Sequence, residues 1–502
     1  MSLTRRSPRW LGSLLALGAG LLLPFAFAPY GAWWVAPLSL AALFLSWHAA
    51  TPRLAALRGY LFGAGFFGHG VAWVQISIHQ FGLPLYSFSV SMTALFALYL
   101  ALYPALTGWL VRRLPATGEL TRLAVLAPAL WTLVEWSRGW LFSGFPWLVL
   151  GDSQTDSPLR GWLPILGASG TTLLLVTMAA AGCVAGLGRS WGRAGLCVLA
   201  AALPVLVGRA LVPLEWTQAN GPPQSVALVQ GAVPQEIKWL PATRATTLAR
   251  YAALTEPHWG TDIIVWPETA LPAFPQEISD YLQQLARRAE DSHSLFLLGL
   301  PTSENAERYF NSVLLLGPHE GRYSKHHLVP FGEYLPYDRQ LRPLLDFLSI
   351  PMSSFTPGAP RQPVLQTGTL KLGVTICYED AFASEVSKAL PDANLLVNVS
   401  NDAWFGDSAA PHQHLQIARV RALESGRDLL RATNTGISAL IDHRGQVLAR
   451  SPQFTPVVVT GTTQPRAGMT PFTRYGPWPS LLLAVALVLS VSLRGRRVPP
   501  RS

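Results

Sequence analysis

The chain has 502 residues, of which 50% are hydrophobic and only 13% are charged. Because soluble domains carry about 25% charged residues, this composition excludes a wholly soluble enzyme and also a disordered chain. The three cysteines, an odd number, do not form a disulfide framework. The net charge of +10 comes mainly from arginine, since the chain has only four lysines.

Apolar runs of membrane-spanning length are concentrated in the first 213 residues, and one more lies near the C-terminus. A spanning helix needs about 20 mostly apolar residues. The runs lie near residues 10–28, 33–50, 59–78, 88–111, 122–142, 161–187, 193–212 and 479–493. We therefore expect a polytopic α-helical bundle of eight transmembrane helices, divided into a seven-helix domain (1–213), a globular domain (214–470) and a last helix with a basic tail (471–502).

The basic residues mark alternate loops between these runs, which is the bias that sets the orientation of a membrane protein. The marked side carries Arg5, Arg6, Arg9, Arg53, Arg58, Arg112, Arg113, Arg122, Arg189, Arg193, Arg494, Arg496, Arg497 and Arg501. The opposite short loops carry only Arg160. This pattern predicts cytoplasmic termini and a globular domain outside the cytoplasm. The first run also has features of a cleaved secretory signal, and cleavage would leave that location unchanged.

The globular region contains short, β-branched runs of strand length, bounded by Gly, Pro, Asn or Asp. They lie at residues 225–233, 262–270, 294–301, 311–317, 370–380, 393–402, 437–442 and 456–463. Helical patterns occur between them, at residues 277–292 and 414–433. The alternation of strands and helices predicts a layered α/β domain.

Three reactive side chains follow predicted strands: Glu268, Lys325 and Cys377. Side chains at strand ends converge from distant parts of a sequence in α/β sheets. A carboxylate can take the proton of a thiol, and a nearby lysine favours the thiolate and stabilises an oxyanion. The three residues therefore predict a nucleophilic site, and a buried, inert cysteine is the alternative that spacing leaves open.

The segments "WPETALP", "YSKHHLVPFGEYLP" and "GVTICYEDAF" resemble the Glu, Lys and Cys motifs of the nitrilase superfamily. Together with the apolar runs on both sides, they resemble the apolipoprotein N-acyltransferase family, a membrane-anchored branch of that superfamily. The apolar segments at 65–74 and 144–170 are also similar to family stretches. The resemblance implies an α-β-β-α nitrilase-type sandwich that faces the periplasm from the bacterial inner membrane.

The resemblance further implies a ping-pong acyl transfer. Cys377, deprotonated by Glu268, would take a fatty acyl chain from a membrane glycerophospholipid as a thioester, and Lys325 would hold the oxyanion. The α-amino group of an apolipoprotein's diacylglyceryl-cysteine would then accept the chain. No metal, soluble cofactor or nucleic acid is implied. The alternatives are a membrane-tethered amidohydrolase that uses water, and a transporter or receptor whose outer domain only binds ligands.

Four further residues are expected to support this chemistry. Glu333 resembles the family's second acidic residue, which would orient Lys325. Tyr378 and Glu379 match family positions that shape the turn of the nucleophile. Asn311 is expected to position the loop around Lys325 through side-chain hydrogen bonds.

Aromatic and apolar residues of the globular region suggest where substrate binds. By the resemblance, Trp239 lines the substrate cleft, whereas Trp404 is either part of that cleft or of the core. The segment 334–358 is rich in Leu, Phe and Ile, which is typical of either a core element or a lid that meets acyl chains.

Three ionisable residues fall within apolar runs, where such residues are functional by default. They are His69, Glu135 and Arg138. Glu135 and Arg138, three residues apart, share one face of a helix and either pair with each other or hold a phospholipid head group.

Overall fold

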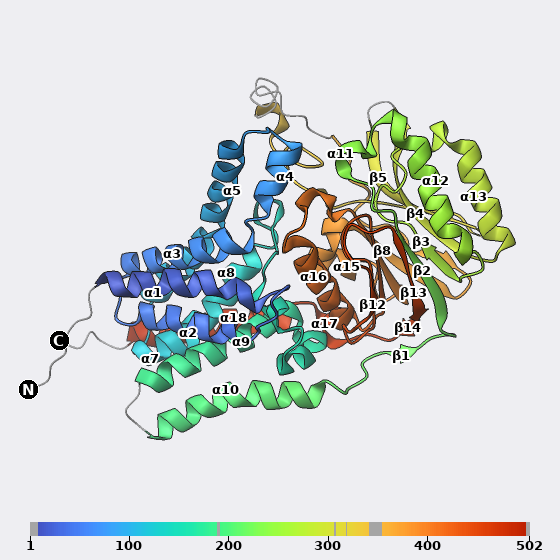
Figure 1. Ribbon diagram of the computed structural model, residues 1–502. Helices are drawn as coiled ribbons and strands as arrows, with labels where there is room; N and C mark the ends of the chain where they lie inside the picture. Colours follow the sequence, from blue (N-terminus) through green and yellow to red (C-terminus); the bar gives the residue numbers. More distant parts are fainter. Residues whose placement is uncertain (1–8, 188–190, 306–307, 318, 341–353, 498–502) are drawn as a thin grey trace, which may run out of the picture. The chain divides into compact units, whose positions relative to one another are not determined.

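The structure is a computed structural model that describes residues 9–187, 191–305, 308–317, 319–340 and 354–497. It consists of two compact units (Figure 1). Unit 1 comprises Met1–Gln75, Tyr86–Leu214 and Arg474–Ser502, and unit 2 comprises Ile76–Leu85 and Glu215–Thr473. The short segment Ile76–Leu85 thus belongs to unit 2, although it lies in sequence between helices of unit 1. The domain boundaries expected after residues 213 and 470 stay a prediction.

Unit 1 is helical. Its helices are α1 (Arg9–Leu22), α2 (Val35–Trp47), α3 (Pro52–Gly70), α5 (Tyr86–Leu100), α6 (Leu102–Arg113), α7 (Glu119–Thr121), α8 (Ala127–Ser137), α9 (Leu163–Leu187), α10 (Trp191–Leu211) and α18 (Trp478–Arg497). A π-helical turn (Arg122–Leu126) precedes α8, and short 3₁₀ turns lie between α8 and α9. Helix α4 (Val74–Phe81) begins in unit 1 and continues into unit 2.

In the described part of the chain, four helical segments are long and apolar enough to span a membrane. They are Arg9–Ala26, Tyr86–Arg113, Pro158–Leu187 and Trp478–Arg497. Helices α3 and α4, bent by 57° relative to each other, form a fifth span if they are taken together. Helices Val35–Trp47 and Gly195–Leu211 are apolar but shorter. The expected number of eight spans therefore stays a prediction.

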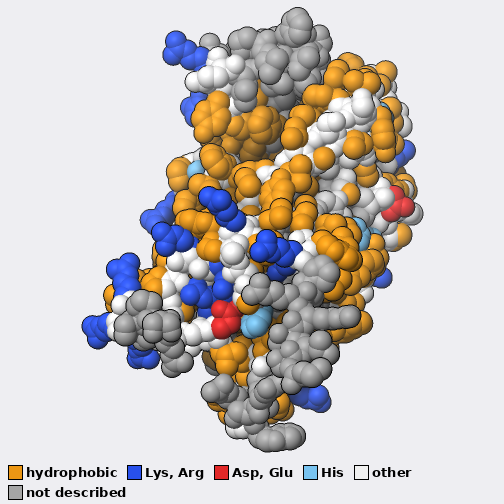
Figure 2. All heavy atoms as spheres, turned by 90° about the vertical axis from the view of Figure 1, so that its left-hand side faces the viewer, with side chains coloured by type: hydrophobic (Ala, Val, Ile, Leu, Met, Phe, Trp, Pro, Cys, Tyr) orange, Lys and Arg blue, Asp and Glu red, His pale blue; other side chains and the backbone are white. Residues whose placement is uncertain are grey.

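The outward faces of several unit 1 helices are apolar. Leu482, Leu489 and Leu493 on α18 are 64%, 56% and 55% exposed, and Leu196 and Leu206 on α10 are 67% and 65% exposed. Figure 2 shows a face of the molecule on which hydrophobic side chains predominate, with Lys and Arg gathered in separate groups. Exposed apolar surface of this extent fits contact with lipid rather than with water.

The charged residues Glu135 and Arg138 hold an irregular segment inside unit 1. Arg138 donates hydrogen bonds to the backbone carbonyls of Phe145, at 2.7 Å, and Trp147. Glu135 accepts from the backbone N–H of Leu150 at 3.2 Å and from the hydroxyl of Thr172 at 2.7 Å. Their bonds therefore satisfy backbone groups between α8 and α9, which is a structural role.

Unit 2 contains two six-stranded sheets, with strand orders β13-β2-β3-β4-β5-β6 and β12-β11-β10-β9-β8-β7. The strands are β2 (Gln224–Gln230), β3 (Ile263–Val265), β4 (Leu295–Asn305), β5 (Arg308–Leu316), β6 (Gly321–Ser324), β7 (Leu365–Thr367), β8 (Leu370–Ile376), β9 (Leu395–Ser400), β10 (Leu429–Thr433), β11 (Ala439–Ile441), β12 (Val447–Arg450) and β13 (Val457–Thr463). A small pair joins β1 (Gln218–Ala219) to β14 (Arg466–Ala467). The central strands β2-β3-β4 and β8-β9-β10 are parallel, and the outer strands are antiparallel.

The two sheets pack face to face, and helices cover their outer faces (Figure 1). Alternate side chains of a strand point to opposite faces, so Val226 and Leu228 of β2 enter the core between the sheets. Ala227 and Val229 point outward, toward α12 (Arg244–Thr255) and α13 (Ser279–Asp291). The other sheet is covered by α15 (Ala383–Ser387) and α16 (Ala410–Ser425). This α-β-β-α sandwich agrees with the expected fold of the globular region.

One predicted helix was wrong in its second half. The helical pattern of residues 414–433 is a helix only as far as Ser425, where α16 ends. Gly426 caps it in the left-handed conformation, with φ +64°. Residues Leu429–Thr433 then form β10, between β9 and β11. The apolar spacing continued across the glycine, and pairing with two neighbouring strands outweighed it.

Candidate active site

Three side chains predicted to react lie together in unit 2. Glu268 follows β3, Lys325 follows β6 and Cys377 follows β8, so each stands just after a strand. The Nζ atom of Lys325 is 3.6 Å from Oε1 of Glu268. The charges of Glu268 and Lys325 both act on the Cys377 thiol. Folding therefore assembles a carboxylate, an ammonium group and a thiol from three distant parts of the chain.

The backbone is strained at Cys377 and at the residue directly after Glu268. Cys377, the first residue of the short 3₁₀ helix η9 (Cys377–Ala381), has φ +52°. Thr269, directly after Glu268, has φ +47°. A non-glycine residue in this region costs on the order of 1–3 kcal/mol and persists only where the surrounding structure enforces it. Such strained turns are concentrated at functional sites.

Lys325 lies between two carboxylates and is almost fully buried. Its Nζ is 2.8 Å from Oε2 of Glu333, which is closer than its distance to Glu268. The Asn311 side chain donates to Oε1 of Glu268 at 2.6 Å and to Oε1 of Glu333 at 3.1 Å. The backbone N–H of Lys325 donates to the carbonyl of Asn311 at 2.7 Å. Glu333 thus pairs with Lys325, and the Asn311 side chain bridges Glu268 and Glu333, whereas the roles expected of Glu333 and Asn311 stay predictions.

The second oxygen of Glu268 is the candidate proton acceptor. Glu268 is 6% exposed, and within the described residues its Oε2 is buried without a hydrogen-bond partner. Since Oε1 is occupied by Asn311 and Lys325, only Oε2 is left to take a proton. An unpaired buried carboxylate oxygen costs free energy, so its retention beside a thiol fits a general base.

Electrostatics keep the thiol protonated and the lysine charged. Burial raises the pKa of Cys377 above its usual value, the charge of Glu268 raises it further, and Lys325 opposes this. Burial alone would lower the pKa of Lys325, but Glu333 and Glu268 outweigh it and raise that pKa. The resting site therefore holds a neutral thiol beside an ammonium group, and the thiol requires a base before it can attack.

Glu379 connects the backbone after Lys325 to the turn that begins at Cys377. Its carboxylate accepts hydrogen bonds from the backbone N–H groups of His326 at 2.7 Å, His327 at 3.0 Å and Ile376 at 2.8 Å. The hydroxyl of Tyr323 also donates to it, at 3.0 Å. Burial raises the pKa of Glu379 to about 7, although the backbone donors favour the charged form. Glu379 therefore ties the backbone after Lys325 to the end of β8.

The remaining predicted residues lie around this centre. Tyr378 is 8% exposed and packs edge-on against Phe382, with ring centroids 5.0 Å apart. Trp239 follows α11 (Gln235–Lys238) and is 50% exposed. Trp404, in η10 (Asp402–Phe405), is 36% exposed and packs edge-on against Phe81 at 4.7 Å. Most of the expected lid, 341–353 of 334–358, lies outside the described residues.

Sequence reasoning missed Lys238. This lysine is 1% exposed, and its Nζ donates to the backbone carbonyl of Glu268 at 3.3 Å. Burial lowers the pKa of Lys238 to about 8, and Glu268 counteracts this in part. The contact holds the turn that presents Glu268. The rarity of lysine in this chain was the available signal, since Lys238 is one of only four.

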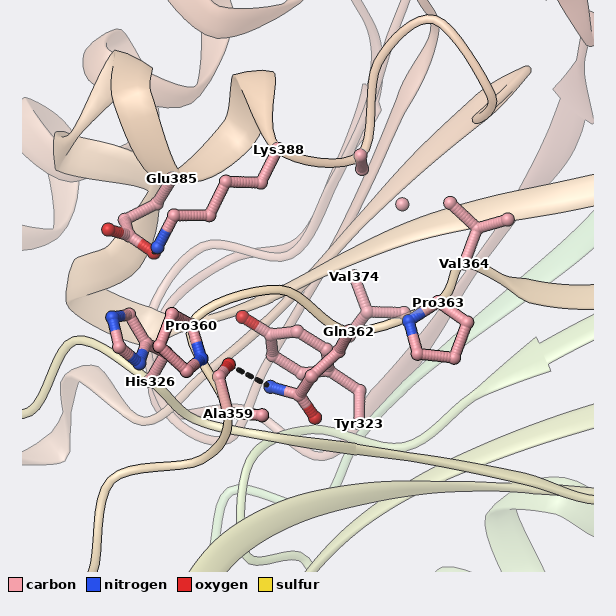
Figure 3. Close-up of a pocket in the computed structure, with 12 residues that line it drawn as sticks. Tyr323, His326, Ala359, Pro360, Gln362, Pro363, Val364, Val374, Glu385 and Lys388 are labelled. Atoms are coloured by element: carbon pink, nitrogen blue, oxygen red, sulfur yellow. Dashed lines mark hydrogen bonds and ion pairs between the residues drawn. The ribbon is translucent and has the colours of Figure 1, made fainter.

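A small pocket lies beside the segment that carries Lys325. Figure 3 shows it lined by Tyr323, His326, Gln362 and the ion pair of Lys388 with Glu385, whose charged atoms are 2.6 Å apart. Its volume is about 20 Å³, which is room for roughly one water molecule. This pocket is therefore too small for an acyl chain.

Comparisons with known proteins identify the family. Residues 19–181 match the family model of the apolipoprotein N-acyltransferase N-terminal domain, and residues 225–471 match that of carbon-nitrogen hydrolases. The apolipoprotein N-acyltransferase of Methylococcus capsulatus is 47% identical, over 96% of both chains. This chain belongs to the apolipoprotein N-acyltransferase family. The family's enzyme from Vibrio cholerae is 42% identical, over 95% of this chain and 96% of its own.

Solved hydrolases are also among the structures to which part of this chain is similar. A carbon-nitrogen hydrolase from Helicobacter pylori is 15% identical, with a TM-score of 0.37, over 55% of this chain and 95% of its own. The family membership makes this chain an acyltransferase homologue with a nitrilase-superfamily domain, and its apolar helices are consistent with transmembrane segments.

Proposed function

We propose that this protein transfers a fatty acyl chain from a membrane glycerophospholipid to the α-amino group of the N-terminal diacylglyceryl-cysteine of apolipoproteins. The acceptor is supported by the names of the relatives, which are apolipoprotein N-acyltransferases. The observation that carries the chemistry is the buried group of Glu268, Lys325 and Cys377, in which Oε2 of Glu268 has no partner among the described residues.

In the first half-reaction, Oε2 of Glu268 takes the proton of the Cys377 thiol and the thiolate attacks an ester carbonyl of the phospholipid. The carbonyl oxygen becomes an oxyanion, which the ammonium group of Lys325 and backbone N–H groups stabilise. When the intermediate collapses, the ester C–O bond breaks and Glu268 returns the proton to the departing lysophospholipid. The acyl chain remains on Cys377 as a thioester.

In the second half-reaction, the amine of the diacylglyceryl-cysteine attacks the thioester. Glu268 accepts a proton from the attacking nitrogen. The C–S bond then breaks, an amide forms and the proton returns to the sulfur of Cys377. Glu333, Asn311 and Glu379 hold Lys325 and the turn that carries Cys377 in position, and Tyr378 packs beside this turn. Trp239 and Trp404 are proposed to line the cleft for lipid and peptide. No metal or soluble cofactor enters either step.

We further propose that the chain lies in the bacterial inner membrane with unit 2 in the periplasm and both termini in the cytoplasm. The distribution of arginine over the short loops supports this orientation. In that position the bilayer supplies the acyl donor. The acceptor, anchored by its own diacylglyceryl group, reaches the same surface.

The decisive experiment is intact-mass spectrometry of the full chain in detergent after incubation with phospholipid and no acceptor. We expect an adduct of one fatty-acyl mass that hydroxylamine removes. It should be absent from Cys377→Ala and present in Cys183→Ala, which removes a buried thiol of unit 1. Addition of a diacylglyceryl-cysteine peptide should discharge the adduct as an N-acyl peptide, whereas the N-acetylated peptide should not.

The alternatives predict other results. Discharge by water at the same rate with and without the peptide would indicate an amidohydrolase. The absence of any adduct on folded wild-type protein, together with normal function of Cys377→Ala, would indicate a ligand-binding transporter or receptor.

A further inference from the structure

Four charged side chains are buried directly behind the nucleophile turn. Asp380 and Arg431 are 0% exposed, Asp402 is 1% exposed and His414 is 2% exposed. They come from η9, β10, η10 and α16. Burial of an ionised group is costly unless it is paired. Two acids and two bases in one buried cluster therefore need an explanation.

The cluster is internally paired through both aspartates. Nε2 of His414 is 2.8 Å from Oδ1 of Asp380, and its Nδ1 is 2.9 Å from Oδ1 of Asp402. Arg431 reaches the other oxygen of each aspartate, at 3.2 Å and 3.0 Å. Because both ring nitrogens of His414 face carboxylates, both donate and the ring is a cation. Burial lowers the pKa of His414, but the two aspartates outweigh this and raise it to about 9.

This cluster reaches the sulfur of Cys377 through one hydroxyl. Ser400, the last residue of β9, is 0% exposed, and its Oγ donates to Oδ1 of Asp402 at 3.1 Å. Ser400 also lies next to Cys377, because β8 and β9 are paired and the residues directly before them, Ile376 and Val399, are partners. The Ser400 side chain lowers the pKa of the Cys377 thiol, whereas the charge of Asp402 raises it. Ser400 thus stands between the reacting residue and the buried cluster.

We propose that Ser400 is a further catalytic residue, whose hydroxyl hydrogen-bonds the sulfur of Cys377 and stabilises it as the thiolate, while Asp402 holds that hydroxyl in place between turnovers. This inference rests on the proposed role of Cys377 as the nucleophile. A hydroxyl has one proton and two lone pairs, so Ser400 can donate to Asp402 while it accepts from the thiol. It can donate to the sulfur once the thiol proton has left.

Deprotonation of the thiol changes only the hydrogen bonds of the Ser400 hydroxyl and the sulfur. The thiol proton moves from sulfur to Oε2 of Glu268, and the Ser400 hydroxyl, which keeps its own proton, turns from Asp402 to the thiolate. Asp402 retains Arg431 and His414 as donors, and they keep its pKa low against the opposing effect of burial. The carboxylate therefore stays charged when the hydroxyl leaves it. The other charges that act on the thiol, Glu268 and Lys325, are unaffected.

The test compares the thiol reactivity of wild type, Ser400→Ala and Ser438→Ala in the full chain. Ser438 is the matched control, since it is also 0% exposed and hydrogen-bonded, but to Gln230 on another strand. The rate of alkylation of Cys377 by iodoacetamide is followed between pH 7 and 10 on the tryptic peptide 372–388, which contains no other cysteine. This rate is proportional to the thiolate fraction and needs no lipid substrate.

We expect Ser400→Ala to slow alkylation by roughly tenfold at each pH below the thiol pKa, because a hydrogen bond to a charged group is lost. Acylation by phospholipid should slow by a similar factor with an unchanged KM. Ser438→Ala should match the wild type in both rates. Ser400→Thr, which keeps the hydroxyl, should restore most of the alkylation rate.

The inference is overturned if Ser400→Ala has the alkylation profile of the wild type, even when its acyl transfer is slow. If Ser400→Ala does not fold, Ser400→Cys replaces it. A thiol is a weaker donor than a hydroxyl, so alkylation of peptide 372–388 should again slow, and an unchanged rate overturns the inference. Failure of the proposed function can be distinguished from failure of this inference, because in the first case the wild-type protein would form no thioester adduct with phospholipid.

Discussion

At the scale of single residues, several side chains of the site each contact two partners. Lys325 touches both Glu268 and Glu333, and Asn311 bridges the same two carboxylates. One ammonium group thus neutralises part of a doubly acidic environment and still faces the thiol. Because each side chain serves two partners, losses at this site should not be additive.

The compact shape of the lysine head group is the basis of the first residue-scale prediction. Lys325→Arg keeps the charge, but a planar guanidinium cannot occupy the space of an ammonium group that is 1% exposed between two carboxylates. We expect thioester formation to slow by roughly a hundredfold or more, the loss typical of a missing oxyanion donor. Single-turnover mass spectrometry with phospholipid measures this rate.

Lys388→Arg provides the matched control, because Lys388 pairs with Glu385 at the edge of the small pocket and its side chain is 30% exposed. Its thioester formation should equal that of the wild type. Near-normal turnover of Lys325→Arg would contradict the oxyanion role of Lys325.

At the scale of elements, the connection between α16 and β10 positions two charged residues of the buried cluster relative to each other. His414 lies on α16 and Arg431 on β10, and the chain reverses between them at Gly426. A Cβ atom at Gly426 would lie 2.7 Å from Cγ2 of Thr217. The residue therefore needs both a positive φ and the absence of a side chain.

We predict that Gly426→Ala destabilises unit 2 by more than its backbone strain alone. Gly368→Ala is the control, since Gly368 also has a positive φ, +53°, but has no neighbouring atom within 4 Å of the added Cβ. The left-handed conformation costs an alanine on the order of 1 kcal/mol in both variants. Thermal unfolding of the full chain in detergent should give a lower Tm for Gly426→Ala than for Gly368→Ala. Equal Tm values would show that Thr217 moves aside without cost.

At the scale of the whole molecule, composition indicates that some parts of the chain suit contact with lipid and others contact with water. The outward leucines of α10 and α18 suit lipid, whereas the arginines outside the globular domain are concentrated near the ends of the apolar runs on one side. Lys and Arg in short loops favour the cytoplasmic side, which is the basis of the orientation proposed above.

The orientation is testable with a membrane-impermeant maleimide on bacterial spheroplasts. Arg53 and Glu320 are exposed and lie on opposite sides in the proposed orientation. In a background that carries Cys183→Ala, Cys197→Ala and Cys377→Ala, which removes all three native thiols, Glu320→Cys should be labelled in intact spheroplasts. Arg53→Cys should be labelled only after the membrane is permeabilised. The reverse pattern would contradict a periplasmic unit 2.

The sequence by itself determined the features that depend on local pattern. Short, β-branched apolar runs predicted most strands of both sheets, longer apolar runs predicted helices that could span a membrane, and motif resemblance singled out Glu268, Lys325 and Cys377. Such features can be predicted from the sequence because burial imposes a regular spacing of apolar residues along a helix or strand, and because the reactive residues directly follow strands. The number of membrane spans is harder to predict from the sequence, since the chain bends at an apolar break between α3 and α4.

Only the tertiary structure decided the contacts made between distant residues. The strand identity of Leu429–Thr433, the bridging of two carboxylates by Asn311 and the path from Ser400 to His414 all follow from which strands and helices lie next to each other. A hydrogen bond requires two atoms within about 3 Å, and residues that meet this condition in the site, such as Tyr323 and Glu379, are as many as 56 positions apart. The packing of two sheets and their helices, not any local pattern, brings them together.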